Sequence, residues 1–207
     1  MMKKVKVLIV DDHAVLRMGL ASLLGAQPDI TVVGDAAGGA DAIAKAVKLA
    51  PDAIVMDLAM PGMDGAETTR ELLKKRPESK VLVLTTFGTS DGIARALEAG
   101  AIGAIMKSAP FDEIVAAIRE TAEGVRHVSA EIERILADDP PVPQLSQRQS
   151  QILESLVRGL TNGDISRQLG ISVDMVKEHM IALFAKIGAA NRTEAVAIAL
   201  RKRLVKQ

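Results

Sequence analysis

The first 124 residues alternate between two hydrophobic periods, and this alternation limits the folds open to the chain more than any other feature. Short runs rich in β-branched residues predict buried strands at 5–10, 30–33, 53–56, 80–85 and 104–106. Helical patterns fill the intervals at 14–24, 40–50, 66–75, 92–99 and 111–122. Five strands that alternate with five helices predict an α/β domain, in which helices cover both faces of a parallel five-stranded sheet.

Residues 145–207 predict a second, all-helical domain whose helices are marked by polar caps. Ser146 with Gln149 has the pattern of a capping box, and Gly159 follows as a helix stop. Further caps and stops predict helices from Thr161 to Gly170, from Ser172 to Ile187 and from Asn191 to about Lys202. The short connection between the second and third of these four helices has the spacing of a helix-turn-helix.

A linker separates the two predicted domains. After Gly124, residues 125–137 have the pattern of one more short helix. Residues 138–143 then contain three prolines and two aspartates, which a helix does not accommodate. We therefore predict domains at 1–124 and 145–207, with residues 125–144 as a stiff linker that includes a short helix.

Charge and composition exclude several classes of protein. The chain is neutral overall, yet residues 145–207 carry ten lysines and arginines against five acidic residues, which leaves the remainder at −5. A compact basic segment favours a polyanionic partner. The chain has no cysteine, which excludes disulfides and thiolate metal sites, and no apolar run is long enough to span a bilayer. We expect a cytoplasmic protein with no membrane partner.

Polar residues stand at the ends of four predicted strands. They are Asp11 and Asp12 after the first strand, Asp57 after the third, Thr85 at the end of the fourth and Lys107 after the fifth. The carboxyl ends of parallel strands share one edge of the sheet, where ligands bind. Three carboxylates at this edge repel one another unless a cation lies among them, and their hard oxygen atoms suit Mg²⁺. The lysine would neutralise an anionic group on a carboxylate, and the hydroxyl would donate a hydrogen bond to it.

Four motifs resemble the receiver domain of two-component response regulators, namely LIVDDHAVLRMGL, PDAIVMDLAMPGMDG, VLVLTT and AGAIGAIMKS. The first also resembles the NarL/FixJ subfamily, and the likeness covers residues 4–124. It implies a flavodoxin-like (βα)5 fold and a phosphorylation-regulated transcription factor rather than an enzyme. In such a protein Asp57 would accept a phosphoryl group from a sensor histidine kinase. The resemblance assigns Asp11, Asp12, Asp57 and the carbonyl of Ala59 to Mg²⁺, and Lys107 and Thr85 to the phosphoryl oxygens.

Two features depart from the receiver pattern and keep other functions open. Ala104 stands three residues before Lys107, where the family has an aromatic side chain that couples phosphorylation to the output surface. A regulator that works without phosphorylation is therefore a second interpretation. A Mg²⁺-dependent aspartyl phosphatase is a third, but its acid/base carboxylate belongs where this chain has Ala59. Ala59 and Phe87 also occupy the positions that orient attacking water in receivers, which predicts slow loss of the phosphoryl group.

Three other polar residues are expected to have structural roles. His13 is expected on the exposed first turn of a helix, without chemistry of its own. Asp64 is expected to serve the turn that Gly62 and Gly65 form rather than the metal, and Arg192 to hold a turn rather than DNA.

The segment from Leu145 to about residue 204 resembles a LuxR-type helix-turn-helix over essentially its whole length. The resemblance implies that the third helix, 173–187, enters the major groove of double-stranded DNA, with Lys177 as the best candidate for a base or phosphate contact. The other residues assigned to DNA are Val173, Asp174, Glu178, His179 and Ile181. A homodimer is expected on DNA or on phosphorylation. The alternative for this segment is a four-helix module that binds other proteins.

Overall fold

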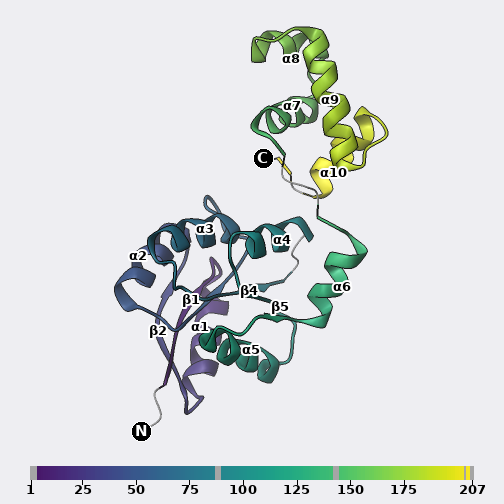
Figure 1. Ribbon diagram of the computed structural model, residues 1–207. Helices are drawn as coiled ribbons and strands as arrows, with labels where there is room; N and C mark the ends of the chain where they lie inside the picture. The colour runs from purple at the N-terminus through teal and green to yellow at the C-terminus, as the bar shows by residue number, and fades with distance from the viewer. Residues whose placement is uncertain (1–3, 87–89, 142–144, 203, 206–207) are drawn as a thin grey trace. The chain divides into compact units, whose positions relative to one another are not determined.

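The computed structural model describes residues 4–86, 90–141, 145–202 and 204–205, which belong to two compact units (Figure 1). The first unit ends at Pro140 and the second begins at Pro141. The elements of the first unit are β1 (Val5–Val10), α1 (Ala14–Gly25), β2 (Ile30–Ala36), α2 (Gly39–Leu49), β3 (Ala53–Met56), α3 (Gly65–Lys75), β4 (Val81–Thr85), α4 (Ser90–Glu98), β5 (Gly103–Met106), α5 (Phe111–Glu123), β6 (His127–Val128) and α6 (Ala130–Asp138).

The strands of the first unit form one parallel sheet in the order β2-β1-β3-β4-β5-β6. The order changes direction at β1, because β2 lies on one side of it and β3 on the other. A parallel α/β fold was predicted, and it is confirmed. The carboxyl ends of β1 and β3 flank this change of direction, the usual place for a ligand in an open α/β sheet.

Two hydrophobic cores, one on each face of the sheet, hold the first unit together (Figure 1). Helices α2, α3 and α4 cover one face, and α1 and α5 cover the other. Side chains alternate along each strand, so Leu8 enters the first core and Ile9 the second. Every residue of β3 is buried, as expected for a strand covered on both sides.

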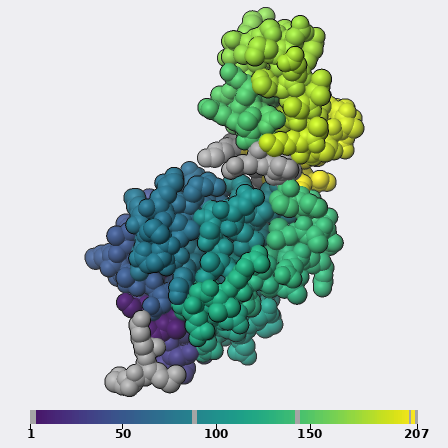
Figure 2. All heavy atoms as spheres, in the orientation of Figure 1, coloured from purple at the N-terminus to yellow at the C-terminus, as the bar shows by residue number. Residues whose placement is uncertain are grey.

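Residues 125–140 differ from the predicted linker, because they belong to the first unit (Figure 2). His127 and Val128 add a sixth strand to the five predicted, paired in parallel with Gly103 and Ala104 of β5. A Cβ on Gly103 would lie 2.6 Å from the carbonyl oxygen of His127, so glycine permits this pairing. Helix α6 then packs on the sheet through Ile132, which is fully buried. A strand of two residues is too short to show a period, and its absence from the sequence prediction follows from that. Residues 142–144 of the predicted linker lie outside the described residues.

The second unit consists of α7 (Gln147–Val157), α8 (Asn162–Leu169), α9 (Val173–Ile187) and α10 (Arg192–Arg201), packed around a core of their own. The predicted caps are confirmed, with complete capping boxes at Ser146 and Thr161. Arg192 donates a hydrogen bond to the carbonyl oxygen of Leu160 at 2.6 Å, so it holds a turn, as expected. Among the described residues, no helix has both the length and the apolar character needed to cross a membrane.

Candidate functional site

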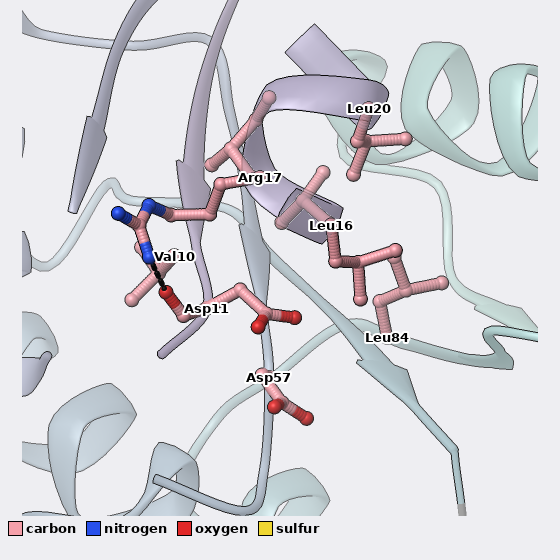
Figure 3. A pocket seen from close by; sticks show the side chains of 9 residues that line it. Val10, Asp11, Leu16, Arg17, Leu20, Asp57 and Leu84 are labelled. Carbon is pink, nitrogen blue, oxygen red and sulfur yellow. Dashed lines mark hydrogen bonds between the residues drawn. The ribbon is translucent and has the colours of Figure 1, made fainter. Parts of the chain in front are cut away.

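Two carboxylates lie side by side at the carboxyl edge of the sheet (Figure 3). Asp11 follows β1 and Asp57 follows β3, and the Asp57 backbone N–H donates to the carbonyl oxygen of Val10 at 2.8 Å. This bond continues the ladder between the two strands one residue beyond their ends. Asp11 is 4% exposed and Asp57 is 2% exposed, so both acids are removed from bulk water.

Lys107 joins the two acids from the end of β5. Its Nζ atom lies 2.5 Å from Oδ2 of Asp11 and 3.0 Å from Oδ2 of Asp57. Burial raises the pKa of the Asp57 carboxyl above its ordinary value, and the hydrogen bond and charge of Lys107 oppose that rise. One ammonium group facing two buried carboxylates leaves the pocket with excess negative charge. The site therefore favours a further cation.

Asp12 and His13 extend the acidic group. One ligand atom from each of Asp11, Asp12, His13 and Asp57 lies within 4.8 Å of the others. The Oδ1 atom of Asp12 is buried and accepts no hydrogen bond from the described residues, although His13 Nδ1 lies 2.8 Å from it. A buried carboxylate oxygen with no donor is a ready ligand for a hard cation.

The remaining residues predicted for this site are also at its edge. Thr85 ends β4 and is buried, and its carbonyl oxygen accepts the Lys107 backbone N–H at 2.7 Å. Ala59 is exposed, and its N–H lies 3.4 Å from Asp57 Oδ1. The structure thus brings together Asp11, Asp12, Asp57, Ala59, Thr85 and Lys107 at one edge. Phe87, predicted beside them, lies outside the described residues.

Two residues near the acids have contacts that the sequence reasoning missed. Arg17 donates to the carbonyl oxygen of Asp11 at 2.7 Å (Figure 3) and to Asp35 Oδ2 at 2.9 Å, so it fixes the backbone that carries the acids. His13 is exposed as predicted but lies against the acidic group rather than apart from it. The sequence signal for this contact was that His13 directly follows Asp11 and Asp12.

The turn after β3 is shaped by Asp64 and Gly65. Asp64 caps α3 by accepting the Glu67 N–H at 2.8 Å, which confirms its predicted role in the turn. A Cβ on Gly65 would lie 2.2 Å from the carbonyl oxygen of Asp57. Glycine therefore allows α3 to begin directly against the residue that carries the candidate nucleophile.

In the second unit, α9 has a buried side and a charged side. Val176, Leu183 and Ile187 are buried against the other helices. The outward side carries Asp174 and Lys177, whose side chains pair at 2.9 Å and are 85% and 58% exposed. Val173, Glu178 and Ile181 are also exposed, and His179 is half-buried. Two short helices, α8 and α9, joined by a tight turn at Gly170, form a helix-turn-helix.

An acidic pocket at the switch point of a parallel α/β sheet, together with a helix-turn-helix unit, defines a two-domain regulatory protein. The response regulator receiver domain pattern matches residues 7–119, and the pattern of bacterial regulatory proteins of the luxR family matches residues 143–199. The chain belongs to the family of response regulators that combine these two domains. This family consists of transcriptional regulators and not of enzymes.

Individual relatives match along the whole chain. Transcriptional regulatory protein LiaR of Bacillus subtilis is 36% identical over 97% of this chain and 99% of its own. The crystal structure of ChrA, a response regulator in a heme-sensing two-component system, is 37% identical, with a TM-score of 0.60 over 99% of this chain and 100% of its own. A structure of two RcsB dimers bound to two parallel DNAs matches with a TM-score of 0.68 at 21% identity, covering 97% and 99%. The last likeness concerns the fold alone.

Proposed function

We propose that Asp57 accepts a phosphoryl group and that this modification controls DNA binding by α9. The observation that carries the proposal is the pair of buried carboxylates of Asp11 and Asp57, which Lys107 contacts together. A purely structural role would be served by one ion pair, since unpaired buried charge lowers stability. A pocket with one carboxylate more than its lysine can neutralise is suited to binding a cation together with an anionic group.

In the proposed reaction an Asp57 carboxylate oxygen attacks the phosphorus of a phosphohistidine. The P–N bond breaks, the imidazole of the donor leaves, and an acyl phosphate forms on Asp57. Lys107 lies 3.0 Å from Asp57 Oδ2 and would pair with the new phosphoryl oxygens. The hydroxyl of Thr85, at the end of β4, would then turn to donate a hydrogen bond to them.

Asp11, Asp12, Asp57 and the carbonyl of Ala59 would hold the Mg²⁺ that this chemistry needs. The donor set consists of oxygen atoms, which this ion prefers, and the buried Oδ1 of Asp12, which accepts no hydrogen bond from the described residues, supports it. A bound Mg²⁺ offsets the negative charge of the incoming phosphoryl group. By lowering the pKa of Asp57, a cation also keeps that carboxylate ionised as a nucleophile.

A sensor histidine kinase is the proposed donor, and a groove beside Lys107 is suited to receive it. The groove has a volume of about 630 Å³ and lies between α1 and α5. Its rim carries Val15, 86% exposed, and Leu23, 52% exposed. An apolar surface next to the acidic pocket would hold a donor protein in place while its histidine reaches Asp57.

For the second unit we propose binding to promoter DNA in the cytoplasm, as a homodimer. The exposed side of α9, with Lys177 near its first turn, has the geometry of a recognition helix. RcsB, which has the same fold, is seen as dimers on DNA. A two-fold arrangement would place two α9 helices on a palindromic site, one helical turn apart.

The experiment that tests the proposed function combines both units in the full chain. The protein is incubated with Mg²⁺ and acetyl phosphate, weighed intact, and titrated against DNA fragments selected from a random library. We expect a phosphoprotein that binds selected DNA more tightly than the untreated chain. A phosphoprotein with unchanged affinity would contradict the regulation, and no uptake of phosphate would leave a regulator that works without phosphorylation.

Replacing Lys177 by alanine should weaken binding to selected DNA by about 1–3 kcal/mol. The change removes a cation and also releases the exposed carboxylate of Asp174, which would then face the phosphates unpaired. Equilibrium titration at physiological salt measures the effect. Arg158→Ala removes the same charge at the end of α7 and should leave the preference for selected over random DNA intact. Equal losses in the two variants would make Lys177 an ordinary surface cation.

Ala59→Asn should shorten the lifetime of the phosphoryl group on Asp57. The Ala59 backbone lies next to the Asp57 carboxylate, and an amide side chain there would orient the attacking water. Positioning and general-base help contribute about 10²–10⁴-fold where they operate, and we expect at most the lower end from one amide. Intact-mass measurements after removal of the donor give the half-life. Ala59→Val is the control, and equal half-lives of all three proteins would exclude this position from the control of hydrolysis.

A further inference from the structure

Ile181 is an apolar side chain on the outward side of α9. It is 71% exposed, although Val176 and Leu183, on the other side of the helix, are completely buried. Single exposed apolar residues are common, so exposure alone does not define a site. The position is informative, because Ile181 lies one helical turn beyond Lys177 and two beyond Asp174, on the same side.

Major-groove edges of DNA offer one apolar group, the C5-methyl of thymine. Isoleucine cannot donate a hydrogen bond to a phosphate or accept one from a base. It is β-branched and so holds essentially one χ1 rotamer in a helix, which lowers the entropy lost on contact. We propose that Ile181 reads the methyl group of a thymine and thereby selects an A·T pair one turn along the groove from Lys177. This inference rests on the proposed binding of DNA by α9.

The test replaces thymines of a selected DNA site, one at a time, by deoxyuridine, which lacks only the methyl group. We expect the wild-type full chain to lose about fourfold in affinity at one position of each half-site. Ile181→Ala should bind the thymine and deoxyuridine sites equally, whereas Ile181→Val should retain part of the difference. Leu200→Ala, at a 46% exposed position of α10, is the control and should keep the full difference.

The outcomes separate this inference from the function on which it rests. A wild-type chain that selects no DNA from the library would overturn the proposed binding itself. A chain that selects DNA but is insensitive to deoxyuridine at every position would overturn only the role of Ile181. The same conclusion follows if Ile181→Ala keeps the wild-type sensitivity. Circular dichroism of each variant checks that α7 to α10 remain folded.

Ala104 stands in β5 at the position where receivers carry the aromatic side chain. Ala104 is completely buried, its carbonyl oxygen accepts the Ser129 N–H at 3.0 Å, and it pairs with Val128 of β6. Ile132 of α6 is buried in the same core. Helix α6 packs on β5 within this core, so a large side chain in place of Ala104 would have to displace part of the core.

The C-terminal end of α6 is hydrogen-bonded to the first residue of α4. The Oγ atom of Ser90, the first residue of α4, donates to Oδ2 of Asp139 at 2.8 Å, and Ser90 is 1% exposed. Asp139 is the C-cap residue of α6 and directly precedes Pro140, the last residue of the first unit. Ser90 follows Thr85, the proposed partner of the phosphoryl group, by five positions in the chain.

We infer that the Ser90–Asp139 bond carries a shift of α4 to the end of α6, and so links phosphorylation to the linker without an aromatic switch. This inference also rests on the proposed phosphorylation of Asp57. It makes Ser90 a positioning residue, which contacts neither the phosphoryl group nor DNA. Replacing Ser90 should therefore change how strongly phosphorylation of Asp57 alters DNA affinity. It should change neither phosphoryl uptake nor the DNA affinity of the unphosphorylated chain.

The measurement is the ratio of DNA affinities with and without phosphorylation in the full chain. Ser90→Ala should reduce this ratio about 2- to 10-fold, as expected for one lost hydrogen bond, while phosphoryl uptake stays at the wild-type level. Ser79→Ala is the control, because its buried hydroxyl has no hydrogen-bond partner among the described residues. A wild-type ratio in Ser90→Ala would overturn the inference, whereas a wild-type protein whose DNA affinity does not change on phosphorylation would contradict the proposed regulation. No uptake by the wild type would instead overturn the proposed function.

Discussion

Replacing Asp57 by alanine will abolish phosphoryl uptake from acetyl phosphate and Mg²⁺. Asp57 is the carboxylate that lies at the end of a central strand, 2% exposed and 3.0 Å from the Lys107 ammonium. Asp11 shares the lysine, but its Oδ1 accepts the His13 N–H at 2.7 Å, whereas Oδ1 of Asp57 accepts the longer bond from the Ala59 N–H, at 3.4 Å. We expect no other carboxylate of the chain to take over the reaction.

Intact-mass spectrometry measures this result, since each phosphorylated chain gains the mass of one phosphoryl group. Asp57→Asn keeps the shape of the side chain and should be equally inactive, which separates loss of the nucleophile from loss of packing. Asp64→Asn is the control, because Asp64 caps α3 near the site without belonging to the acidic group. Uptake by Asp57→Ala at the wild-type level would refute the assignment.

Ile132→Ala should lower the free energy of unfolding of the first unit by about 2–5 kcal/mol. Ile132 is completely buried in the core that also contains Ala104 and Met106, so truncation leaves a cavity between α6 and the sheet. If residues 125–144 were a solvated linker, the same change would have almost no effect. The prediction therefore tests whether α6 belongs to the first unit.

Because the chain has no tryptophan and no tyrosine, calorimetry or far-UV circular dichroism is the suitable probe of unfolding. Val125→Ala is the matched control, since Val125 is 48% exposed in the same segment and its truncation should cost less than about 0.5 kcal/mol. A loss below about 0.5 kcal/mol for Ile132→Ala would place α6 in solvent.

Much of the acidic site was predictable because most of its residues directly follow or end a strand. In a parallel sheet that placement fixes the edge at which a side chain lies, whatever the strand order. Asp11, Asp57 and Lys107 are therefore found where the sequence put them. His13 was assigned no part in the site, because an exposed helix start gives no signal about the groups it faces.

The helices of the second unit were predicted nearly to the residue, for a local reason. Capping is a contact between a side chain and a backbone N–H three positions later, so the sequence itself contains both partners. Ser146 with Gln149 and Thr161 with Asp164 form such pairs. Which residues of α9 contact DNA is a different question, and Lys177, His179 and the others assigned to DNA stay predictions.

The sequence by itself determined the alternation of strands and helices, the caps and the residues at the strand ends, because each depends on a local pattern. Only the tertiary structure decided that His127 and Val128 join the sheet and that Ile132 is buried in the same core as Ala104. It also decided that Ser90 meets Asp139, distant in the chain. Periodicity shows which side of a helix is apolar but not which surface that side meets, and that surface is assembled only when remote segments pack together.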